Sequence, residues 1–404
     1  MVDFKKLCEK YDTPLYVYDF NKIEENFLNL KKAFKARKSL ISYAIKANSN
    51  LSVLKKLASL GSGADCVSIG EIKRALIAGI PKYKIVFSGV GKRDEEIREA
   101  LKLDILFINL ESEAEMDRVE EIAKSLDKKA RISIRVNPDI DPKTHPYIST
   151  GLSENKFGVD IESAKKMYLR ANKSHYLEPV GIHFHIGSQL TDIEPIKEAS
   201  RIVADLTRAL INIGIEIKFF DIGGGLGIVY KDEKTIKPYD YAQAIFSNLK
   251  GLDLTVVCEP GRYIVGNAGY FLTKVLYEKR TKNKRFIIVD GAMNDLLRPS
   301  LYKAYHKVEV LRNDEAKSKA DVVGPVCESG DFLAKDAFLP KTKHNDIIVI
   351  YSAGAYGFVM SSNYNTRPRA AEIAVEDGKD RVIRDRESFE DLIALEKKYL
   401  WIFL

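Results

Sequence analysis

Several short apolar runs in this chain end on side chains that could do chemistry. Lys46 lies near the end of LISYAIKAN, His183 and His185 lie in GIHFHIGS, three glycines follow FFDI, and Glu259 ends TVVCE. A lysine amine can act as a nucleophile, imidazoles and carboxylates transfer protons, and successive glycine amides can cradle a phosphate. These residue types together are typical of an enzyme active site, provided that the fold brings them to one place.

The elements that carry these side chains alternate regularly along the first two thirds of the chain. Short β-branched runs are each followed by an amphipathic helical pattern, which is typical of a parallel sheet covered by helices. The runs are 40–47, 63–68, 84–89, 104–110, 131–138, 180–188, 219–225 and 254–262. Eight such units predict an α/β fold of the (β/α)8, TIM-type barrel class. An open doubly wound sheet is the alternative, but the count of eight and the lack of GxGxxG after the first run argue against it.

Segments on both sides of this region complete the predicted fold. The helical segment 21–35 can take the place of the helix missing after the last run. Beyond about residue 262 the helical pattern stops, and strand-like runs predict a mostly antiparallel β domain. These runs are 270–279, 285–291, 306–311, 320–327, 346–352, 370–377 and 381–384. The strand-like run 14–20 is expected to join them, so we predict a barrel at 21–260 and a β domain formed by 1–20 and 261–404.

The carboxyl ends of the barrel strands should meet at one rim, where the catalytic residues of this fold collect. The polar residues expected there are Lys46, Asp65, Ser88, Arg135, His183, His185, Ser188, Gly223, Gly224, Gly225, Glu259 and Arg262. The glycines follow the seventh run, which is the usual phosphate position of the fold. This convergence predicts an active site at the rim.

Structural roles are the alternative for each of these residues taken alone. A lysine at a strand end usually extends its amine into solvent, and a glycine triplet usually forms a turn. Asp65 and Arg135 could form a buried ion pair that closes the barrel, and Asp221 could orient the turn before the glycines. Only their meeting at the rim distinguishes the two kinds of role.

The histidine pair raises the alternative of a metal site. Two histidines two apart on a strand, His183 and His185, point the same way, as in barrel metallohydrolases, but a metal needs ligands on other strands. Only His145 lies elsewhere in the rim region, and the eighth run ends in Glu-Pro-Gly-Arg rather than a lone aspartate. We therefore expect no metal. The other histidines lie in polar, loop-like contexts and receive no function; they are His175, His306 and His344.

Composition excludes several other classes of protein. The 404 residues include 64 basic and 57 acidic ones, interleaved, for a net charge of +7. The densest basic run, 279–285, lies between two strand-like segments, where a solvated hairpin tip is expected rather than a nucleic-acid surface. No apolar stretch approaches the ~20 residues of a membrane span, and the N-terminus lacks the apolar core of a signal peptide. Four scattered cysteines without zinc-like spacing complete the expectation of a cytoplasmic protein with no nucleic-acid or membrane partner.

Six motifs appear in one order along the chain: YAIKAN, HFHIGS, DIGGG, CEPGRYIV, GPVCESGD and GAYGF. Together they resemble the pyridoxal-phosphate-dependent decarboxylases of the alanine-racemase-like barrel fold. The resemblance extends from PLYVYD near the N-terminus to RPRAAE at 367–372. Each motif alone is moderately specific, whereas six in order are strongly so. The resemblance implies an enzyme that uses pyridoxal 5'-phosphate to remove a carboxylate from a basic amino acid.

The resemblance also assigns cofactor roles. Lys46 would hold the cofactor as a Schiff base, and we expect apolar burial to favour its neutral, nucleophilic amine. Glu259 would stabilise a proton on the ring nitrogen, and His185 would stack on the ring face, with His183 as a supporting core residue. The implied cofactor set is Lys46, Asp65, His185, Ser188, Gly223, Gly224, Gly225, Glu259, Gly261, Arg262 and Tyr356.

Cys327, in GPVCESGD, matches the family residue that returns a proton to the substrate carbon. A free cysteine after an apolar strand is usually core filler, but the neighbouring Glu328, Ser329 and Asp331 favour a function. In the family this segment reaches the active site of the partner subunit. The resemblance therefore implies a homodimer in which Lys46 comes from one chain and Cys327 from the other.

The distal end of the substrate distinguishes members of the family. Ornithine and lysine present only an ammonium there, whereas diaminopimelate presents an ammonium and a carboxylate. Arg298 and Tyr302 lie one helical turn apart in RPSLY, and a guanidinium binds a carboxylate through two bonds. By resemblance they form a clamp with Glu328, which takes the ammonium, while Arg262 and Tyr356 complete the substrate set. This implies decarboxylation of meso-2,6-diaminopimelate to L-lysine and CO2, the last step of lysine biosynthesis.

Three other functions stay open at this point. Carboxynorspermidine decarboxylase shares the fold and cofactor but must fit a longer polyamine. A non-catalytic carrier of pyridoxal phosphate would normally lack the β domain. A barrel metallohydrolase would need the further ligands that the sequence does not supply.

Overall fold

The computed structural model describes residues 2–141, 156–312 and 316–400, so His145 lies outside the described residues. The chain forms two compact units. One comprises Glu24–Val229 and Glu233–Ile264, and the other comprises Met1–Ile23, Tyr230–Asp232 and Val265–Leu404. The domain limits predicted from the sequence stay a prediction.

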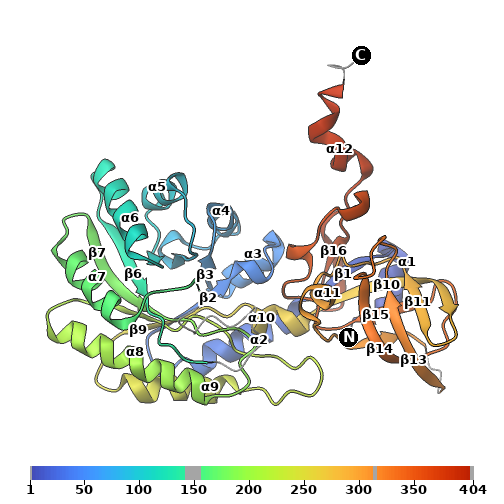
Figure 1. Ribbon diagram of the computed structural model, residues 1–404, viewed down its shortest axis with the longest axis horizontal. Coiled ribbons are helices and arrows are strands. Elements are labelled where there is room, and N and C mark those ends of the chain that lie inside the picture. Colours follow the sequence, from blue (N-terminus) through green and yellow to red (C-terminus); the bar gives the residue numbers. More distant parts are fainter. Residues whose placement is uncertain (1, 142–155, 313–315, 401–404) are drawn as a thin grey trace. The chain divides into compact units, whose positions relative to one another are not determined.

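Eight parallel strands close into a barrel in the first unit (Figure 1). They are β2 (Ser39–Ala44), β3 (Gly63–Cys66), β4 (Ile85–Phe87), β5 (Phe107–Leu110), β6 (Ala130–Arg135), β7 (Leu177–His183), β8 (Phe219–Asp221) and β9 (Thr255–Cys258). Each strand pairs with its neighbours in chain order, and β9 closes the barrel by pairing with β2, with Ser39 opposite Val256. The predicted barrel is confirmed, with strands shorter than the apolar runs because the ends of those runs form the rim.

Helices cover the outside of the barrel (Figure 1). They are α3 (Leu51–Ser59), α4 (Ile69–Ile77), α5 (Asp94–Leu103), α6 (Glu113–Ser125), α7 (Ile161–Lys173), α8 (Glu194–Asn212), α9 (Pro238–Phe246) and the single turn α10 (Arg262–Val265). Because α10 is so short, the helix before the first barrel strand, α2 (Phe20–Ala33), takes the missing place as predicted. Its Glu24 pairs with Lys56 of α3, and Phe34 packs edge-on against Phe246 of α9 at 5.6 Å between ring centroids.

The second unit is built on a nine-stranded, mostly antiparallel sheet. Its strands are β1 (Leu15–Asp19), β10 (Gly269–Arg280), β11 (Arg285–Val289), β12 (Val308–Val310), β13 (Lys317–Val323), β14 (Phe332–Pro340), β15 (Ile347–Ile350), β16 (Ala371–Glu376) and β17 (Lys379–Arg384). As predicted, β1 joins this sheet, between β10 and β16. The sequence patterns missed β14, in which Lys335 and Asp336 interrupt the apolar alternation and are both exposed.

Short elements complete the second unit. The basic run 279–285 is a hairpin tip, as predicted, because the Thr281 amide donates to the Lys284 carbonyl at 2.8 Å between β10 and β11. Three helices belong to this unit: α1 (Phe4–Tyr11), α11 (Arg298–Tyr302) and α12 (Phe389–Lys397). Across the described parts of the chain, every helix is too short or too polar to cross a membrane.

Candidate active site

Lys46 lies just beyond the first barrel strand rather than at its end. β2 ends at Ala44, and Ile45–Ala47 form one 3-10 turn, η1, that carries Lys46. The Lys46 amine donates to Oδ2 of Asp65, on β3, at 3.3 Å. The lysine side chain is 41% exposed while that of Asp65 is buried. The expectation of apolar burial is therefore wrong, and a buried carboxylate faces the amine instead.

Three buried acids converge at the rim: Asp65 on β3, Asp221 at the end of β8 and Glu259 directly after β9. Burial raises the pKa of Asp65, and the nearby Glu259 raises it further, against the lowering effect of Lys46. Burial and then Glu259 raise the pKa of Asp221 well above its ordinary value. Burial also raises the pKa of Glu259, but Lys46 and a hydrogen bond with Asp221 act to lower it. Burial therefore favours the neutral form of both acids, and the charge of Lys46 opposes this at Glu259.

Both histidines of HFH are neutral. Burial lowers the pKa of His183 to about 3, and burial likewise lowers the pKa of His185 well below its ordinary value. His183 Nε2 lies 3.6 Å from Glu259 Oε2, while His185 Nδ1 accepts a hydrogen bond from the Gly224 amide at 3.3 Å. This hydrogen bond holds Nδ1 of His185 at the glycine turn.

One histidine of HFH and two of the buried acids lie close enough together to be candidate metal ligands. Ligand atoms of His183, Asp221 and Glu259 lie within 4.8 Å of one another. The sequence had not indicated that Asp221 and Glu259 would join His183 in this way.

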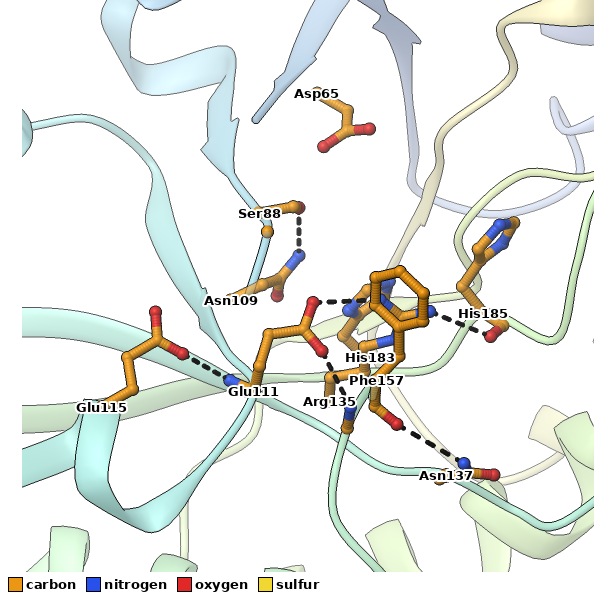
Figure 2. A network of polar contacts seen from close by, with 12 residues as sticks. Asp65, Ser88, Asn109, Glu111, Glu115, Arg135, Asn137, Phe157, His183 and His185 are labelled. Carbon is orange, nitrogen blue, oxygen red and sulfur yellow. Dashed lines mark hydrogen bonds and ion pairs between the residues drawn. The ribbon is translucent and has the colours of Figure 1, made fainter. Parts of the chain in front are cut away.

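Arg135 pairs with Glu111, not with Asp65, so the predicted ion pair is wrong (Figure 2). Arg135 Nη1 lies 2.9 Å from Glu111 Oε1, and both side chains are buried. Arg135 Nη2 also donates to the His185 carbonyl at 3.2 Å. The guanidinium lies over the Phe157 ring at 4.7 Å. Arg135 therefore fixes the backbone that carries His185 and does not reach Lys46's partner.

The glycine triplet forms a cradle that no side chain could share. A Cβ on Gly224 would lie 2.1 Å from the Glu259 carbonyl oxygen, and one on Gly225 would lie 2.3 Å from the Gly187 carbonyl oxygen. The Gly223 amide donates to Asp221 Oδ1 at 3.0 Å, which confirms the expected orienting role of Asp221. Because Asp221 takes this amide, Gly223 is less suited than predicted to donate to a phosphate.

Two further predicted residues lie together near this cradle. Arg262 Nη2 donates to Ser188 Oγ at 3.1 Å, and Arg262 Nε donates to the same oxygen at 3.3 Å. Arg262 is buried at the start of α10. Gly261, one residue earlier, passes so close to Ala47 that a Cβ would meet the Ala47 Cβ at 2.9 Å. A guanidinium and a hydroxyl side by side suit an anion such as a phosphate.

The sequence patterns did not single out two rim residues, one on β5 and one directly after it. Asn109 Nδ2 donates to Ser88 Oγ at 3.1 Å (Figure 2). It also donates to Asp221 Oδ2 at 3.3 Å, so it connects the third, fourth and seventh strands of the barrel. Glu111, directly after β5, forms the ion pair with Arg135. The rule that strand ends carry function, applied to the run 104–110, points to both residues.

Arg298 is buried on α11 in the second unit, not at the surface as RPSLY alone would indicate. Its Nη1 donates to the Tyr230 hydroxyl at 2.8 Å and contacts His306 Nε2 at 3.3 Å. Tyr302, at the other end of the same helix, is half-buried. Tyr356 adopts a left-handed backbone with φ of +57°. RPSLY is helical, which is the condition under which Arg298 and Tyr302 can share a face.

Cys327 lies exposed in the loop between β13 and β14, so it is not core filler. The Cys327 amide donates to Asn365 Oδ1 at 3.0 Å. Asp331 shapes the loop, because its two carboxylate oxygens accept the Val326 and Met293 amides, each at 2.7 Å. Glu328 is exposed in the same loop. Asn365 was not predicted, although it lies just before the RPRAAE segment.

The residues of the barrel rim fit pyridoxal 5'-phosphate. Lys46 offers an amine, and the glycine cradle and Arg262 offer a phosphate site. Glu259 Oε1 and Asp65 Oδ1 are buried without a hydrogen-bond partner among the described residues. Buried polar atoms are normally hydrogen-bonded, so these two oxygens are suited to bind a polar group of a cofactor or substrate. Fold and site thus define a (β/α)8-barrel enzyme built for a phosphorylated carbonyl cofactor.

Comparison with known proteins identifies the family. Residues 20–266 match the family described as pyridoxal-dependent decarboxylase, pyridoxal binding domain. A diaminopimelate decarboxylase from Campylobacter jejuni is 63% identical over 99% of this chain and 100% of its own length. Another from Aquifex aeolicus is 50% identical over 97% of this chain and 93% of its own length. The chain therefore belongs to the pyridoxal-dependent decarboxylases, and among them to the diaminopimelate decarboxylase group.

Solved structures agree with this assignment. The crystal structure of diaminopimelate decarboxylase from Helicobacter pylori complexed with L-lysine matches with a TM-score of 0.96 and 60% identity, over 98% of this chain and 100% of that one. The M. jannaschii enzyme in complex with L-lysine matches with a TM-score of 0.93 and 40% identity, over 98% and 94%. The relatives share the whole fold and not only the barrel.

Proposed function

We propose that this chain converts meso-2,6-diaminopimelate to L-lysine and CO2 with bound pyridoxal 5'-phosphate. The observation that carries the proposal is the meeting of the Lys46 amine, at 3.3 Å, with a buried acid cluster at the barrel rim. Full-length similarity to diaminopimelate decarboxylases supports the choice of substrate.

Lys46 is the attachment point of the cofactor, and Asp65 orients its amine. When bound, pyridoxal phosphate supplies an electron sink for the charge left on the substrate carbon after CO2 departs. Glu259 holds a proton at the ring nitrogen through its buried carboxylate. Asp221 lies beside Glu259 and holds the turn before the glycines, because its Oδ1 accepts from the Gly223 amide.

The other rim residues bind and orient the cofactor. His185 would pack on the ring of the cofactor, and Arg135 fixes its backbone through the His185 carbonyl. Gly223, Gly224 and Gly225 leave room for the phosphate. Gly261 lets the chain after the last barrel strand pass close to Ala47, next to Lys46. Ser188, Arg262 and Tyr356 donate to the phosphate oxygens.

Cys327 donates the proton that replaces the departing carboxylate. The reaction balances because meso-diaminopimelate and one proton yield L-lysine and CO2. The exposed position of Cys327 suits action on a second copy of the chain. Asp331 and Asn365 hold the loop that presents it.

Arg298, Tyr302 and Glu328 select the substrate by its distal end. The Arg298 guanidinium takes the carboxylate, Tyr302 adds a hydroxyl, and Glu328 takes the ammonium, with Arg262 and Tyr356 completing the set. Arg298 suits this task because it is buried, where a charge-assisted bond is less screened by water.

A cytoplasmic homodimer is part of the proposal. Every residue of α12 is exposed or half-exposed, including Phe389 at 60% and Leu395 at 79%, and such apolar side chains suit burial against another chain. All four cysteines are free thiols, which a reducing compartment preserves. Lysine biosynthesis is the pathway that this reaction serves.

The direct test offers the purified chain two substrates with pyridoxal phosphate. Released CO2 and L-lysine are expected from meso-diaminopimelate, and little product is expected from carboxynorspermidine, the main alternative. Turnover of carboxynorspermidine with diaminopimelate left intact would contradict the proposed substrate and leave the cofactor assignment standing.

A further inference from the structure

His306 is a buried histidine beside Arg298 that has no place in the function described so far. It lies between α11 and β12 and is 2% exposed. Its Nε2 contacts Arg298 Nη1 at 3.3 Å, and its Nδ1 lies 2.9 Å from the Tyr351 carbonyl oxygen. One imidazole thus connects the guanidinium to the backbone at the end of β15.

The two contacts determine the protonation of the ring. A carbonyl oxygen only accepts hydrogen bonds, so Nδ1 must carry the proton that it donates to Tyr351. A guanidinium only donates, so Nε2 must accept from Arg298 with a lone pair. This assignment follows from the hydrogen-bond network, and it makes His306 a neutral acceptor for Arg298.

Tyr230 holds the same guanidinium from another side. Its hydroxyl accepts from Arg298 Nη1 at 2.8 Å, and its ring lies 4.9 Å from the guanidinium carbon. The Tyr230 and His306 rings meet edge to face at 5.5 Å. An arginine side chain carries about 2 kcal/mol of rotamer entropy, so two partners that hold its head remove a cost that a ligand would otherwise meet.

We propose that His306 is a positioning residue for carboxylate recognition, because its neutral ring holds Arg298 ready for the distal carboxylate of the substrate. The proposal rests on the proposed function, in which Arg298 binds that carboxylate. It adds a residue to the specificity clamp that sequence motifs did not reveal.

The chemistry of a neutral acceptor explains why a histidine suits this place. A glutamate or aspartate there would pair with Arg298 and compete with the substrate carboxylate for the guanidinium. A lysine would repel it. A neutral imidazole accepts one hydrogen bond and leaves the positive charge of Arg298 for the ligand.

The product offers a binding readout that does not depend on turnover. Because meso-diaminopimelate has one L and one D centre, a product with the L configuration keeps the distal carboxylate. L-lysine therefore still presents that group to Arg298, whereas 1,5-diaminopentane has no carboxylate at all. Comparing the two as competitive inhibitors isolates the carboxylate contact.

Two substitutions separate positioning from folding. His306→Gln places an amide oxygen near the position of Nε2 and can still accept from Arg298. His306→Asn places its amide near the position of Nδ1, keeps the bond to Tyr351 and loses the acceptor for Arg298. His344→Asn is the matched control, since His344 Nδ1 also contacts a carbonyl, that of Leu276 at 3.0 Å, in the same unit.

The expected result is a loss specific to the acceptor. H306N should raise KM for diaminopimelate and Ki for L-lysine about tenfold, the effect of one hydrogen bond to a charged group, with kcat changed less than about twofold. H306Q should stay within about threefold of wild type, and inhibition by 1,5-diaminopentane should not change in either variant. H344N should leave KM and both inhibition constants as in wild type.

Two outcomes would overturn the inference. One is an H306N protein that binds L-lysine as tightly as wild type. The other is an equal loss in H306N and H306Q that extends to 1,5-diaminopentane and follows a lower Tm, which is the mark of a structural role. Failure of the proposed function is distinguishable, because then wild-type protein releases no CO2 from diaminopimelate.

Discussion

The Lys46 amine lies 3.3 Å from the buried carboxylate of Asp65, on the neighbouring barrel strand. The register places Ala44 opposite Asp65, so the two side chains meet because η1 follows β2 directly. Asp65→Asn should lower kcat/KM for diaminopimelate about tenfold or more, since a hydrogen bond to a charged group contributes about 1.5–3 kcal/mol. Steady-state kinetics with a Tm measurement checks this.

The control for this variant is Asp253→Asn. Asp253 pairs with Lys38 at 3.1 Å, but its side chain is 85% exposed, so the pair contributes little. Asp253→Asn should leave kcat/KM as in wild type. An Asp65→Asn enzyme with full activity would show that the carboxylate facing Lys46 has no part in the reaction.

Gly224→Ala should abolish cofactor binding. The new Cβ would lie 2.1 Å from the Glu259 carbonyl oxygen, which is backbone and cannot move aside without shifting the acid itself. Absorbance of the bound cofactor after gel filtration measures the loss. Gly91→Ala is the matched control, since a Cβ there meets no atom within 4 Å. Normal cofactor retention by Gly224→Ala would argue against the glycine cradle.

The Glu278–Arg285 pair in the β domain should make stability depend on pH. Burial favours the neutral acid, but hydrogen bonds from Arg285 and Thr342 outweigh it and lower the pKa of Glu278 to about 2. A carboxylate with a lowered folded-state pKa contributes stability that is present above the unfolded value, about 4.3, and is lost as pH falls toward 2. Glu278→Gln should therefore cost about 1–3 kcal/mol at pH 7 and much less near pH 2.

Chemical denaturation of both proteins at pH 7 and at pH 2.5–3 measures this difference. The contribution should shrink steadily between about pH 4.3 and pH 2. A difference between wild type and variant that is as large at about pH 2.5–3 as at pH 7 would show that Glu278 is not held as a carboxylate by Arg285.

Shared active sites can be tested by mixing two inactive proteins. Lys46→Ala lacks the attachment point and Cys327→Ala lacks the proton donor, and each should be inactive alone. If the two residues act across a dimer, one site of each mixed dimer is intact, so random exchange should restore about a quarter of wild-type activity. No recovery after verified subunit exchange would show that both residues act within one chain.

The barrel could be predicted from the sequence because each βα unit is a local pattern. Eight short runs with helices between them leave few other folds, and β1 was recognisable as a strand-like run of apolar and aromatic residues. β14 was missed because Lys335 and Asp336 interrupt its pattern, and only pairing with β13 makes it a strand. Local periodicity reports such a strand poorly, since its partner lies elsewhere in the chain.

Site residues could be predicted where a sequence motif contains them. They could not be predicted where only a contact in the folded chain shows their role. Lys46, His185 and Glu259 follow from the motifs YAIKAN, HFHIGS and CEPGR. The partner of Arg135 was wrong because several acids end neighbouring strands, and the choice of Glu111 over Asp65 depends on side-chain reach. His306 and Asn109 carry no motif, and their importance lies in the neighbours Arg298 and Asp221.

The attachment of the cofactor to Lys46 is the central claim. Borohydride reduction of the protein loaded with pyridoxal phosphate, followed by digestion and mass spectrometry, locates the modified lysine directly. The pyridoxyl phosphate mass is expected on the peptide that contains Lys46, and it should be absent in Lys46→Ala. The mass on another lysine, or a Lys46→Ala protein that keeps the wild-type absorbance of the bound cofactor, would contradict it.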